Sequence, residues 1–388
     1  MFFRNGSEIT PVERENNIFY YFGKVVVDKM ERKKTIAFYI GDLGRGGAER
    51  VIINLSRYFY SNDYIVYLVT KSVDSNEYDV PEGVERIVAD ITAEEESSLR
   101  IVNLLKRIVK LRKIWKRIKP NVIVSFIRKN NLMAIVSSMF TRIPVLVSIR
   151  TDPKLELEDI EKISFFVFRF ADGIICQTAL ARDYLPKYLR KKAVILPNSL
   201  TKEFIRTEYN PNRRPEIVTI GRMIYYKNQR MLLEAFRDIM EDYPEWSLSL
   251  YGEGDTLEEL KKEYACDRIV FHGKVNDIMN RIENASIFAL PSDQEGIPNA
   301  LFEAMALGLA CISTDCPCGG PADLIEDGVD GYLIPVDDKA EMKRYLAKLI
   351  ENEDIRIMLG KNAIKIAKKY DPQTVNRKWF EYIDGFVK

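Results

Sequence analysis

The chain has a single histidine, His272, and only five cysteines in its 388 residues. The cysteines show no paired spacing, and Cys316-Pro-Cys318 is one residue short of a Cys-x-x-Cys motif. A zinc site draws its ligands from cysteine and histidine at characteristic spacings. We therefore expect no zinc site and no disulfide framework, only reduced thiols of the kind found in the cytosol.

Long apolar runs and an excess of one charge are also lacking. No apolar run approaches the length that spans a bilayer, about 18 residues, and residues 1–30 have no apolar stretch like that of a signal peptide. The net charge is +1, so attraction to a membrane or to nucleic acid would need a local patch. We expect a cytoplasmic protein, and no motif predicts nucleic-acid binding.

Two common nucleotide-binding loops are absent. Gly44-Arg-Gly-Gly47 follows an apolar run, but it matches neither the Gly-x-Gly-x-x-Gly fingerprint nor a P-loop, so binding of a dinucleotide or ATP is not predicted. Glycines at this place would let the backbone approach a ligand closely. A plain tight turn between a strand and a helix is the alternative.

What the chain does have is a repeated alternation of short apolar runs and amphipathic segments. Its 46% hydrophobic and 30% charged residues are ordinary for a globular protein, and its length suits two domains of about 150–200 residues. The alternation predicts parallel strands joined by helices. The strands expected in the first half are 35–40, 65–69, 122–126, 145–148, 173–176 and 193–196, with a helix at 48–59.

A polar stretch at 201–215, rich in Asn, Arg and Pro, is the expected linker to a second series of strands. These strands are 217–220, 247–251, 269–272, 287–290 and 310–313, with a helix at 229–240. Ligands bind open parallel sheets beyond the carboxyl ends of the strands, often between domains. The predicted organisation is an N-terminal extension at 1–33, a first domain at 34–200, a second domain at 201–371, and a helix at 372–388 that crosses back to the first domain.

The most specific local pattern is the run from Glu295 to Glu303, which reads Glu-Gly-Ile-Pro-Asn-Ala-Leu-Phe-Glu. It follows an apolar strand and enters a helix near Asn299, so both carboxylates should lie near the opening of one binding site, at the end of that strand. The helix N-terminus offers free N–H groups and a positive dipole end, which suit a phosphate. Carboxylates beside it can accept hydrogen bonds from sugar hydroxyls. From spacing alone, a solvated loop glutamate and a helix-capping glutamate are an equal alternative.

A second polar loop, Gly221-Arg-Met-Ile-Tyr-Tyr-Lys227, also follows a predicted strand. Arg222 and Lys227 could clamp a diphosphate and neutralise the charge that develops on a leaving group. Taken alone the pair is a weak signal, because basic residues after strands are usually solvated.

Taken together, these elements resemble the retaining glycosyltransferases of the family-4 type, which have the GT-B fold. The resemblance runs from residue 34 to the C-terminus and implies two Rossmann-like parallel-sheet domains facing each other across a cleft. The first domain would bind the acceptor and the second the nucleotide sugar. The motifs that carry it are Glu295 to Glu303, Gly46-Gly-Ala-Glu-Arg50, Pro197-Asn198, Gly221-Arg222 with Lys227, and Asp327-Gly-Val-Asp-Gly-Tyr-Leu-Ile-Pro335.

By this resemblance, Glu295 would hold hydroxyls of the donor sugar, Glu303 the ribose, and Arg222 with Lys227 the diphosphate. His272 would be a neighbour of the pocket, or alternatively a buried structural histidine. The other implied donor contacts are Gly46 and Gly47 from the first domain, the loop residues Gly296, Ile297, Pro298 and Asn299, and Lys274 and Val275 beside the base.

The chain departs from the family pattern after the fourth expected strand. Many relatives carry a histidine near the transferring sugar, whereas this sequence reads Ser148-Ile-Arg-Thr-Asp-Pro153. Arg150 stands roughly at that place, and a subset of bacterial relatives has a similar Arg-x-Asp-Pro pattern. We expect Arg150 and Asp152 to border the donor or acceptor sugar; an internal ion pair that shapes the loop is the alternative.

The resemblance implies a retaining hexosyltransferase that uses a nucleotide sugar, with UDP favoured as the nucleotide. Its acceptor would be a glycan or a polyprenyl-linked glycan in bacterial cell-surface polysaccharide synthesis. No metal or other cofactor is expected, because Arg222, Lys227 and helix N–H groups would stabilise the leaving group and the chain has no Asp-x-Asp triplet. Two alternatives stay open: a UDP-sugar 2-epimerase of the same fold, and a non-catalytic protein that binds a membrane surface.

Residues 100–119 contain no acidic side chain, and their apolar positions follow helical spacing. A basic amphipathic helix with a tryptophan, here Trp115, can lie in the interface of an anionic bilayer. We therefore expect peripheral attachment to the inner face of the cell membrane. The alternative is a helix that packs its apolar face on the sheet and leaves its cations in solvent.

Overall fold

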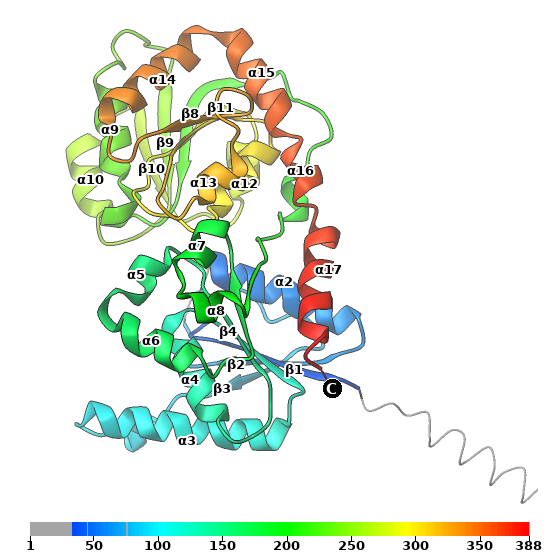
Figure 1. Ribbon diagram of the computed structural model, residues 1–388. Helices are drawn as coiled ribbons and strands as arrows, with labels where there is room; N and C mark the ends of the chain where they lie inside the picture. The colour runs from blue at the N-terminus through cyan, green and yellow to red at the C-terminus, as the bar shows by residue number, and fades with distance from the viewer. Residues whose placement is uncertain (1–32, 45, 75–76, 388) are drawn as a thin grey trace, which may run out of the picture.

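The computed structural model describes residues 33–44, 46–74 and 77–387. Apart from Lys33, the expected N-terminal extension at 1–33 lies outside the described residues. The rest of the chain forms two stacked α/β units, one built on each of two parallel sheets (Figure 1). The predicted fold class is thereby confirmed.

The first sheet has seven strands in the order β3-β2-β1-β4-β5-β6-β7, and every neighbouring pair is parallel. Its central strands are buried on both faces, which is why they read as continuous apolar runs rather than alternating ones. The strands are β1 (Thr35–Ile40), β2 (Ile65–Thr70), β3 (Glu85–Val88), β4 (Val122–Phe126), β5 (Val145–Ser148), β6 (Gly173–Cys176) and β7 (Ala193–Ile195).

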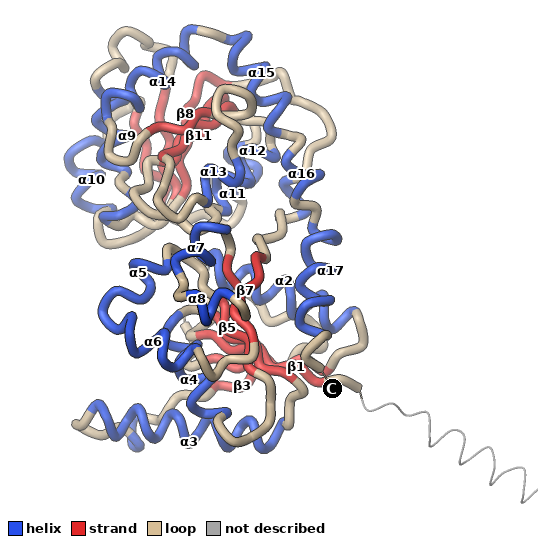
Figure 2. The backbone as a smooth tube through the Cα atoms, in the orientation of Figure 1, coloured by secondary structure: helices blue, strands red, loops and turns tan. Residues whose placement is uncertain are grey.

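Helices cover both faces of this sheet (Figure 2). The longest, α3, caps its end with Lys119 in the left-handed conformation, φ 44°. The α-helices are α2 (Gly47–Ser61), α3 (Arg100–Ile118), α4 (Arg128–Ser138), α5 (Pro153–Leu157), α6 (Glu161–Phe168), α7 (Ala179–Tyr184) and α8 (Lys187–Arg190).

The second sheet has six parallel strands in the order β10-β9-β8-β11-β12-β13. They are β8 (Arg214–Ile220), β9 (Ser247–Tyr251), β10 (Ile269–Gly273), β11 (Ala285–Leu290), β12 (Ala310–Thr314) and β13 (Tyr332–Ile334). The helices of this unit are α9 (Gln229–Arg237), α10 (Leu257–Tyr264), α11 (Ile278–Ile282), α12 (Asn299–Ala306), α13 (Gly320–Leu324), α14 (Lys339–Glu351), α15 (Glu353–Ala363) and α16 (Ile366–Lys369).

The last helix, α17 (Pro372–Asp384), follows the second unit in sequence but packs on α2 of the first (Figure 1). Phe380 joins a cluster of aromatic rings with Tyr58, Phe59 and Tyr64 at centroid distances of 5.0–6.0 Å. Trp379 is fully buried and lies against Phe126 at the end of β4. The helix therefore links the two units by packing as well as by the chain.

The amphipathic segment 100–119 is the α3 helix, and only part of its apolar face is buried. Trp115 is fully buried, with its ring 6.2 Å from that of Tyr39 and its N–H donated to Ser137 Oγ at 2.8 Å. The expectation that Trp115 would lie in a membrane interface is therefore wrong. Toward the N-terminal end of α3, in contrast, Ile101 and Leu105 are 62% and 55% exposed.

Candidate active site

The carboxyl ends of the two sets of strands face each other, and side-chain contacts join the elements that follow them. Asn198, just after β7, donates a hydrogen bond to Asn299 at the start of α12 with a distance of 2.7 Å. Arg50 of α2 forms an ion pair with Glu303 of α12 at 2.6 Å. The edge at which ligands bind parallel sheets is thus shared by both units.

Lys227 and Glu295 are drawn together from two loops of the second unit. Lys227 ends a single turn after β8 and Glu295 follows β11, the strand paired with β8. Their side chains form an ion pair, and Glu295 Oε1 also accepts a hydrogen bond from Ser292 Oγ at 2.9 Å. Glu295 is 9% exposed, so the solvated loop glutamate considered from spacing alone is not what the structure shows.

Glu303 lies on the second turn of α12 and is 5% exposed. Burial raises the pKa of its carboxyl, and the charge of Arg50 acts in the opposite direction. Thr201 Oγ1 lies 3.4 Å from the same oxygen that pairs with Arg50. A cation from the first unit therefore holds this carboxylate in place at the junction of the two units.

Two helix N-termini meet at this junction. A Cβ on Gly47, the first residue of α2, would lie 2.8 Å from Asn299 Nδ2, the first residue of α12. The residues just before the two helices, Gly46 and Pro298, make no side-chain cap, but the carboxylate of Glu49 in the first turn of α2 accepts that residue's own N–H. The free N–H groups and the dipole of α12 favour a ligand that carries negative charge, such as a phosphate, whereas α2 already has a carboxylate at its N-terminus.

The loop between Glu295 and α12 is buried between the units. A Cβ on Gly296 would lie 2.2 Å from Gln177 Oε1 and 2.8 Å from the carbonyl oxygen of Arg150, both from the first unit. Only glycine allows this approach. Ile297 and Pro298 are also buried, so the loop is a wall of the junction.

Arg150, just after β5, is a further partly buried cation of the junction. Its guanidinium contacts Asn198 Oδ1, and its backbone N–H donates to Glu156 Oε2 at 3.1 Å. Burial lowers the pKa of Arg150 to about 10, and burial raises the pKa of Glu156 to about 7. Arg150 therefore remains a cation at neutral pH while Glu156 is only partly ionised.

The other two polar residues expected at the site differ in exposure: Asp152 is buried and Arg222 is exposed. Asp152 is buried and caps α5 by accepting the N–H of Lys154 at 2.9 Å. Its carboxylate shapes the loop through this cap rather than through the ion pair with Arg150 that we considered. Arg222 is exposed at the end of β8 and donates to the Tyr226 hydroxyl at 3.0 Å, which leaves other guanidinium N–H groups for a ligand.

The segment 272–275 lies at the same edge of the second sheet, where Gly273 contacts Gly252 and Gly252 packs closely on Gly221. Gly252 N donates to Gly273 O at 2.8 Å, and a Cβ on Gly252 would collide with Gly221 O at 1.8 Å. Lys274 and Val275 follow directly on the end of β10. His272 is exposed and stacks on Tyr251 with centroids 4.5 Å apart, so the alternative of a buried structural histidine is wrong.

Family models match both units. The model described as Glycosyltransferase Family 4 matches residues 45–203, and the model described as Glycosyl transferases group 1 matches residues 201–366. Together they cover both sheets apart from the first strand. The chain belongs to the family-4 glycosyltransferases.

The similarity to known proteins covers most of this glycosyltransferase. A Campylobacter jejuni relative is 23% identical, covering 90% of this chain and 98% of its own; it is named GalNAc-alpha-(1->4)-GalNAc-alpha-(1->3)-diNAcBac-PP-undecaprenol alpha-1,4-N-acetyl-D-galactosaminyltransferase. The amylovoran biosynthesis glycosyltransferase AmsD of Erwinia amylovora is 22% identical, covering 90% of this chain and 99% of its own. Among solved structures, Anabaena HepE in complex with UDP and glucose has a TM-score of 0.74 at 17% identity, covering 91% of this chain and 100% of its own. This last likeness shows that the glycosyltransferase has the same fold.

Several residues of the junction had no predicted role in the sequence. Arg50 and Asn198 were part of the family motifs, but nothing in their spacing indicated that they pair with Glu303 and Asn299. Glu156 had no signal at all, because a glutamate on a short helix is ordinarily solvated. Contacts between the two units determine the partners of Arg50 and Asn198, whereas Glu156 accepts the backbone N–H of Arg150 in the same unit.

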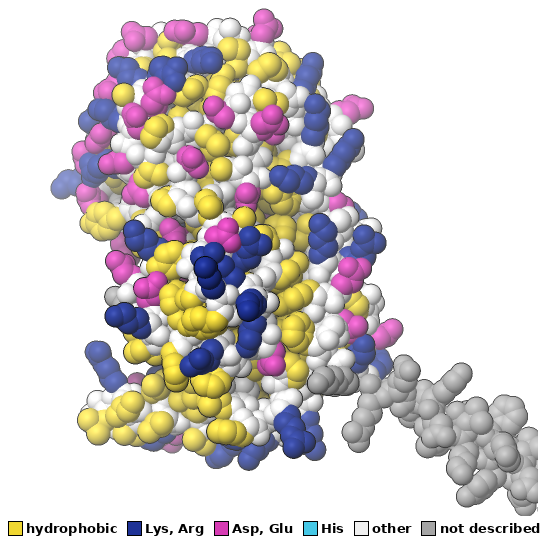
Figure 3. All heavy atoms as spheres, in the orientation of Figure 1, with side chains coloured by type: hydrophobic (Ala, Val, Ile, Leu, Met, Phe, Trp, Pro, Cys, Tyr) yellow, Lys and Arg dark blue, Asp and Glu magenta, His cyan; other side chains and the backbone are white. Residues whose placement is uncertain are grey.

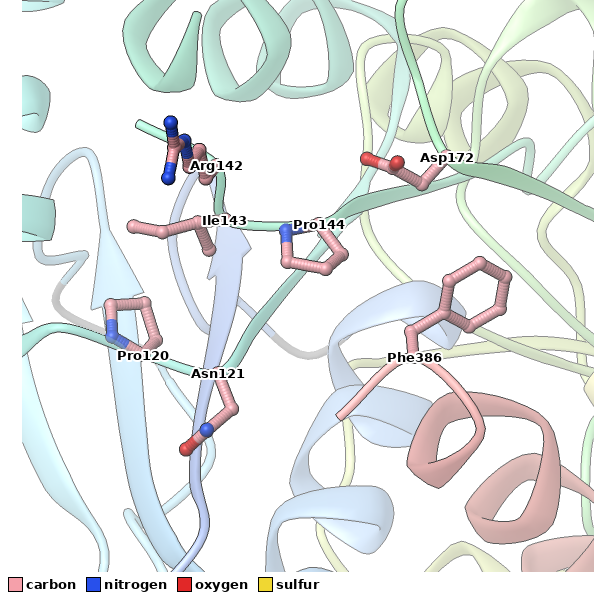
Figure 4. A pocket seen from close by; sticks show the side chains of 7 residues that line it. All are labelled: Pro120, Asn121, Arg142, Ile143, Pro144, Asp172 and Phe386. Atoms are coloured by element: carbon pink, nitrogen blue, oxygen red, sulfur yellow. The ribbon is translucent and has the colours of Figure 1, made fainter. Parts of the chain in front are cut away.

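The glycosyltransferase also has a cavity of about 360 Å³ at the amino ends of β4, β5 and β6, opposite the junction. Figure 4 shows Arg142 and Phe386 on opposite sides of it. Asp172, which lines it, accepts the N–H of Val145, the first residue of β5, at 2.9 Å.

Among the described residues no group of three or more His, Cys, Asp or Glu side chains could hold a metal ion.

Proposed function

We propose that this glycosyltransferase transfers a hexose or N-acetylhexosamine from a UDP-sugar to a polyprenyl-diphosphate-linked glycan, with retention of anomeric configuration. The observation that carries the proposal is the junction where the Lys227–Glu295 and Arg50–Glu303 pairs flank two helix N-termini. Relatives named for undecaprenol-linked acceptors support the acceptor class. A neighbour solved with UDP and glucose supports the donor class.

In the proposed reaction an acceptor hydroxyl attacks the anomeric carbon from the face that UDP leaves. The bond between that carbon and the phosphate oxygen breaks, and the hydroxyl proton passes to the departing diphosphate. Arg222, Lys227 and the N–H groups of α12 stabilise the negative charge that develops there, each good donor contributing roughly 3 kcal/mol. With these groups in place, we propose that the transfer needs no metal.

The test is a panel of UDP- and GDP-sugars, scored by thermal shift and by nucleotide release with a synthetic polyprenyl-diphosphate-linked N-acetylhexosamine. We expect a UDP-sugar to raise Tm and to release UDP only when acceptor is present, with product retaining the donor's anomeric configuration by NMR. Complete conversion of donor to an epimer without acceptor would replace the proposal with a 2-epimerase. If no nucleotide sugar in the panel shifts Tm, the alternative of a non-catalytic binding protein would replace the transferase proposal.

We also propose that the α3 helix holds the enzyme on the inner face of an anionic membrane, where a polyprenyl-linked acceptor is embedded. The exposed residues Ile101, Leu105 and Val109 lie four residues apart, and exposed Lys113 continues the same face. Hydrophobic side chains gather over α3 at the bottom of the molecule (Figure 3). No described helix is long and apolar enough to cross a bilayer, so this attachment would be peripheral.

Sedimentation with vesicles tests the attachment. Wild-type enzyme should bind vesicles rich in phosphatidylglycerol and lose binding in high salt, because each cation near the surface contributes about 1 kcal/mol. Leu105→Glu with Val109→Glu should abolish binding, whereas Met358→Glu, on an exposed residue of α15, should not. Equal binding by all three proteins would show that α3 does not contact the membrane.

A further inference from the structure

The guanidinium of Arg150 rests on two aromatic rings. Its central carbon lies 4.9 Å from the centroid of Phe126 and 5.7 Å from that of Trp379. The rings lie 5.9 Å apart and are tilted by 33°. A guanidinium stacked on aromatic faces gains cation–π attraction and loses freedom to turn. Phe126 ends β4, so one ring comes from the first sheet and the other from α17.

Trp379 also fixes the polar partner of Arg150. Its indole N–H donates to the carbonyl oxygen of Pro197 at 2.9 Å, and the next residue, Asn198, accepts from the Arg150 guanidinium. Trp379 therefore reaches Arg150 by two routes, directly through its ring and through the backbone before Asn198.

The hydrogen bonds of Arg150 leave part of its guanidinium unsupported, which gives the two rings a larger share in holding it. Its Nε atom is buried and has no hydrogen-bond partner among the described residues. A loose arginine could satisfy this group by changing rotamer. A guanidinium held by two rings and Asn198 instead keeps an N–H donor at a fixed place in the junction.

We propose that Trp379 and Phe126 are positioning residues for Arg150, so that the C-terminal helix α17 is part of the catalytic apparatus. The inference rests on the proposed function and on the expectation from the sequence that Arg150 borders the transferring sugar. Because α17 follows the second unit and packs on the first, the place of Arg150 depends on how the two units are joined. Misplacing a charge-stabilising group by about 1 Å can lower turnover up to about 100-fold.

The experiment compares Trp379→Phe, Phe126→Leu and Phe380→Leu with the wild-type enzyme, using the UDP-sugar and acceptor that the panel identifies. Phe380→Leu is the matched control, because this ring lies on the same helix and packs on Tyr58 and Phe59 without contacting Arg150. All assays are run below the Tm of the least stable variant. We expect kcat to fall about tenfold or more in the first two variants, with KM for donor little changed, and to stay near wild type in the control.

A double-mutant cycle with Arg150→Lys separates positioning from general destabilisation. If Trp379 acts through Arg150, Trp379→Phe should lower kcat much less in the Arg150→Lys background than in the wild type. Equal losses in both backgrounds, or a control that loses as much kcat as Trp379→Phe, would overturn the inference while leaving the transferase intact. If Arg150→Lys and Arg150→Gln both keep wild-type turnover, the role of Arg150 in the proposed function fails instead.

Discussion

The ion pair between Arg50 and Glu303 allows a quantitative prediction, because it joins the two units and is nearly closed to solvent. The side chains are 23% and 6% exposed. Removing one partner of a buried pair usually destabilises a protein by about 3–5 kcal/mol, because the other charge is left without a counterion. Since Arg50 is partly exposed, we expect Arg50→Ala to lower the free energy of unfolding by about 3 kcal/mol near pH 8.

The effect should depend on pH in a defined direction. Burial already raises the pKa of Glu303 above its unfolded value, and Arg50 opposes this rise. Without Arg50 the pKa rises further, so Glu303 takes up a proton at higher pH and the buried charge disappears. The penalty of Arg50→Ala should therefore shrink as the pH falls from about 8 toward about 5.

Urea unfolding followed by tryptophan fluorescence measures this difference at each pH. Adding Glu303→Gln to Arg50→Ala should recover much of the lost stability near pH 8, since no buried charge then remains. A loss that is the same at both pH values and is not recovered in the double variant would show that the pair is not a buried link between the units.

Three further predictions follow from individual contacts. Burial raises the pKa of Glu156 from 4.5 to about 7, so the folded state loses stability as the pH rises from 4.5 to about 7, and the loss is constant above that. The advantage of Glu156→Gln over the wild type in urea unfolding should therefore grow by up to about 3 kcal/mol between about pH 5 and pH 8, and a constant difference would contradict this. Gly296→Ala should cut nucleotide release about tenfold or more, because its Cβ would meet Gln177 and the backbone of the first unit; wild-type rates would refute the close approach. Gly320→Ala would put a Cβ 1.5 Å from the carbonyl oxygen of Gly296, so we expect Tm to drop through a loss of about 1–3 kcal/mol, and an unchanged Tm would show that the loop can yield.

The fold was largely predictable because buried parallel strands leave a direct signal. Apolar runs such as 122–126 and 145–148 coincide with β4 and β5. Two strands were missed, β3 and β13. Each lies at an edge of its sheet, and β3 begins with an exposed glutamate while β13 is only three residues long. Short edge strands are defined by pairing with a neighbour, which local composition does not reveal.

The candidate site was predictable only in part. Glu295 and Lys227 each lie in a loop directly after a strand. They could be placed from the sequence because the carboxyl ends of parallel strands meet at one edge of the sheet. Arg50 and Trp379 could not, because their partners lie on elements distant in sequence. Glu156 could not either, because its burial is set by packing and its spacing from Arg150 does not reveal it. Trp115 was misplaced because helical spacing shows which residues share a face, not whether the sheet or solvent lies against it.

The proposed function requires that the junction of the two units bind a nucleoside diphosphate through the loop after β8. Calorimetric titration of UDP, with GDP in parallel, tests it most directly in wild type, Arg222→Gln and Arg57→Gln, the last on an exposed residue of α2. We expect UDP binding to weaken about tenfold or more in Arg222→Gln, since a hydrogen bond to a charged group contributes about 1.5–3 kcal/mol, and to be unchanged in Arg57→Gln. Absence of binding by either nucleotide, or equal affinity in all three proteins, would contradict it.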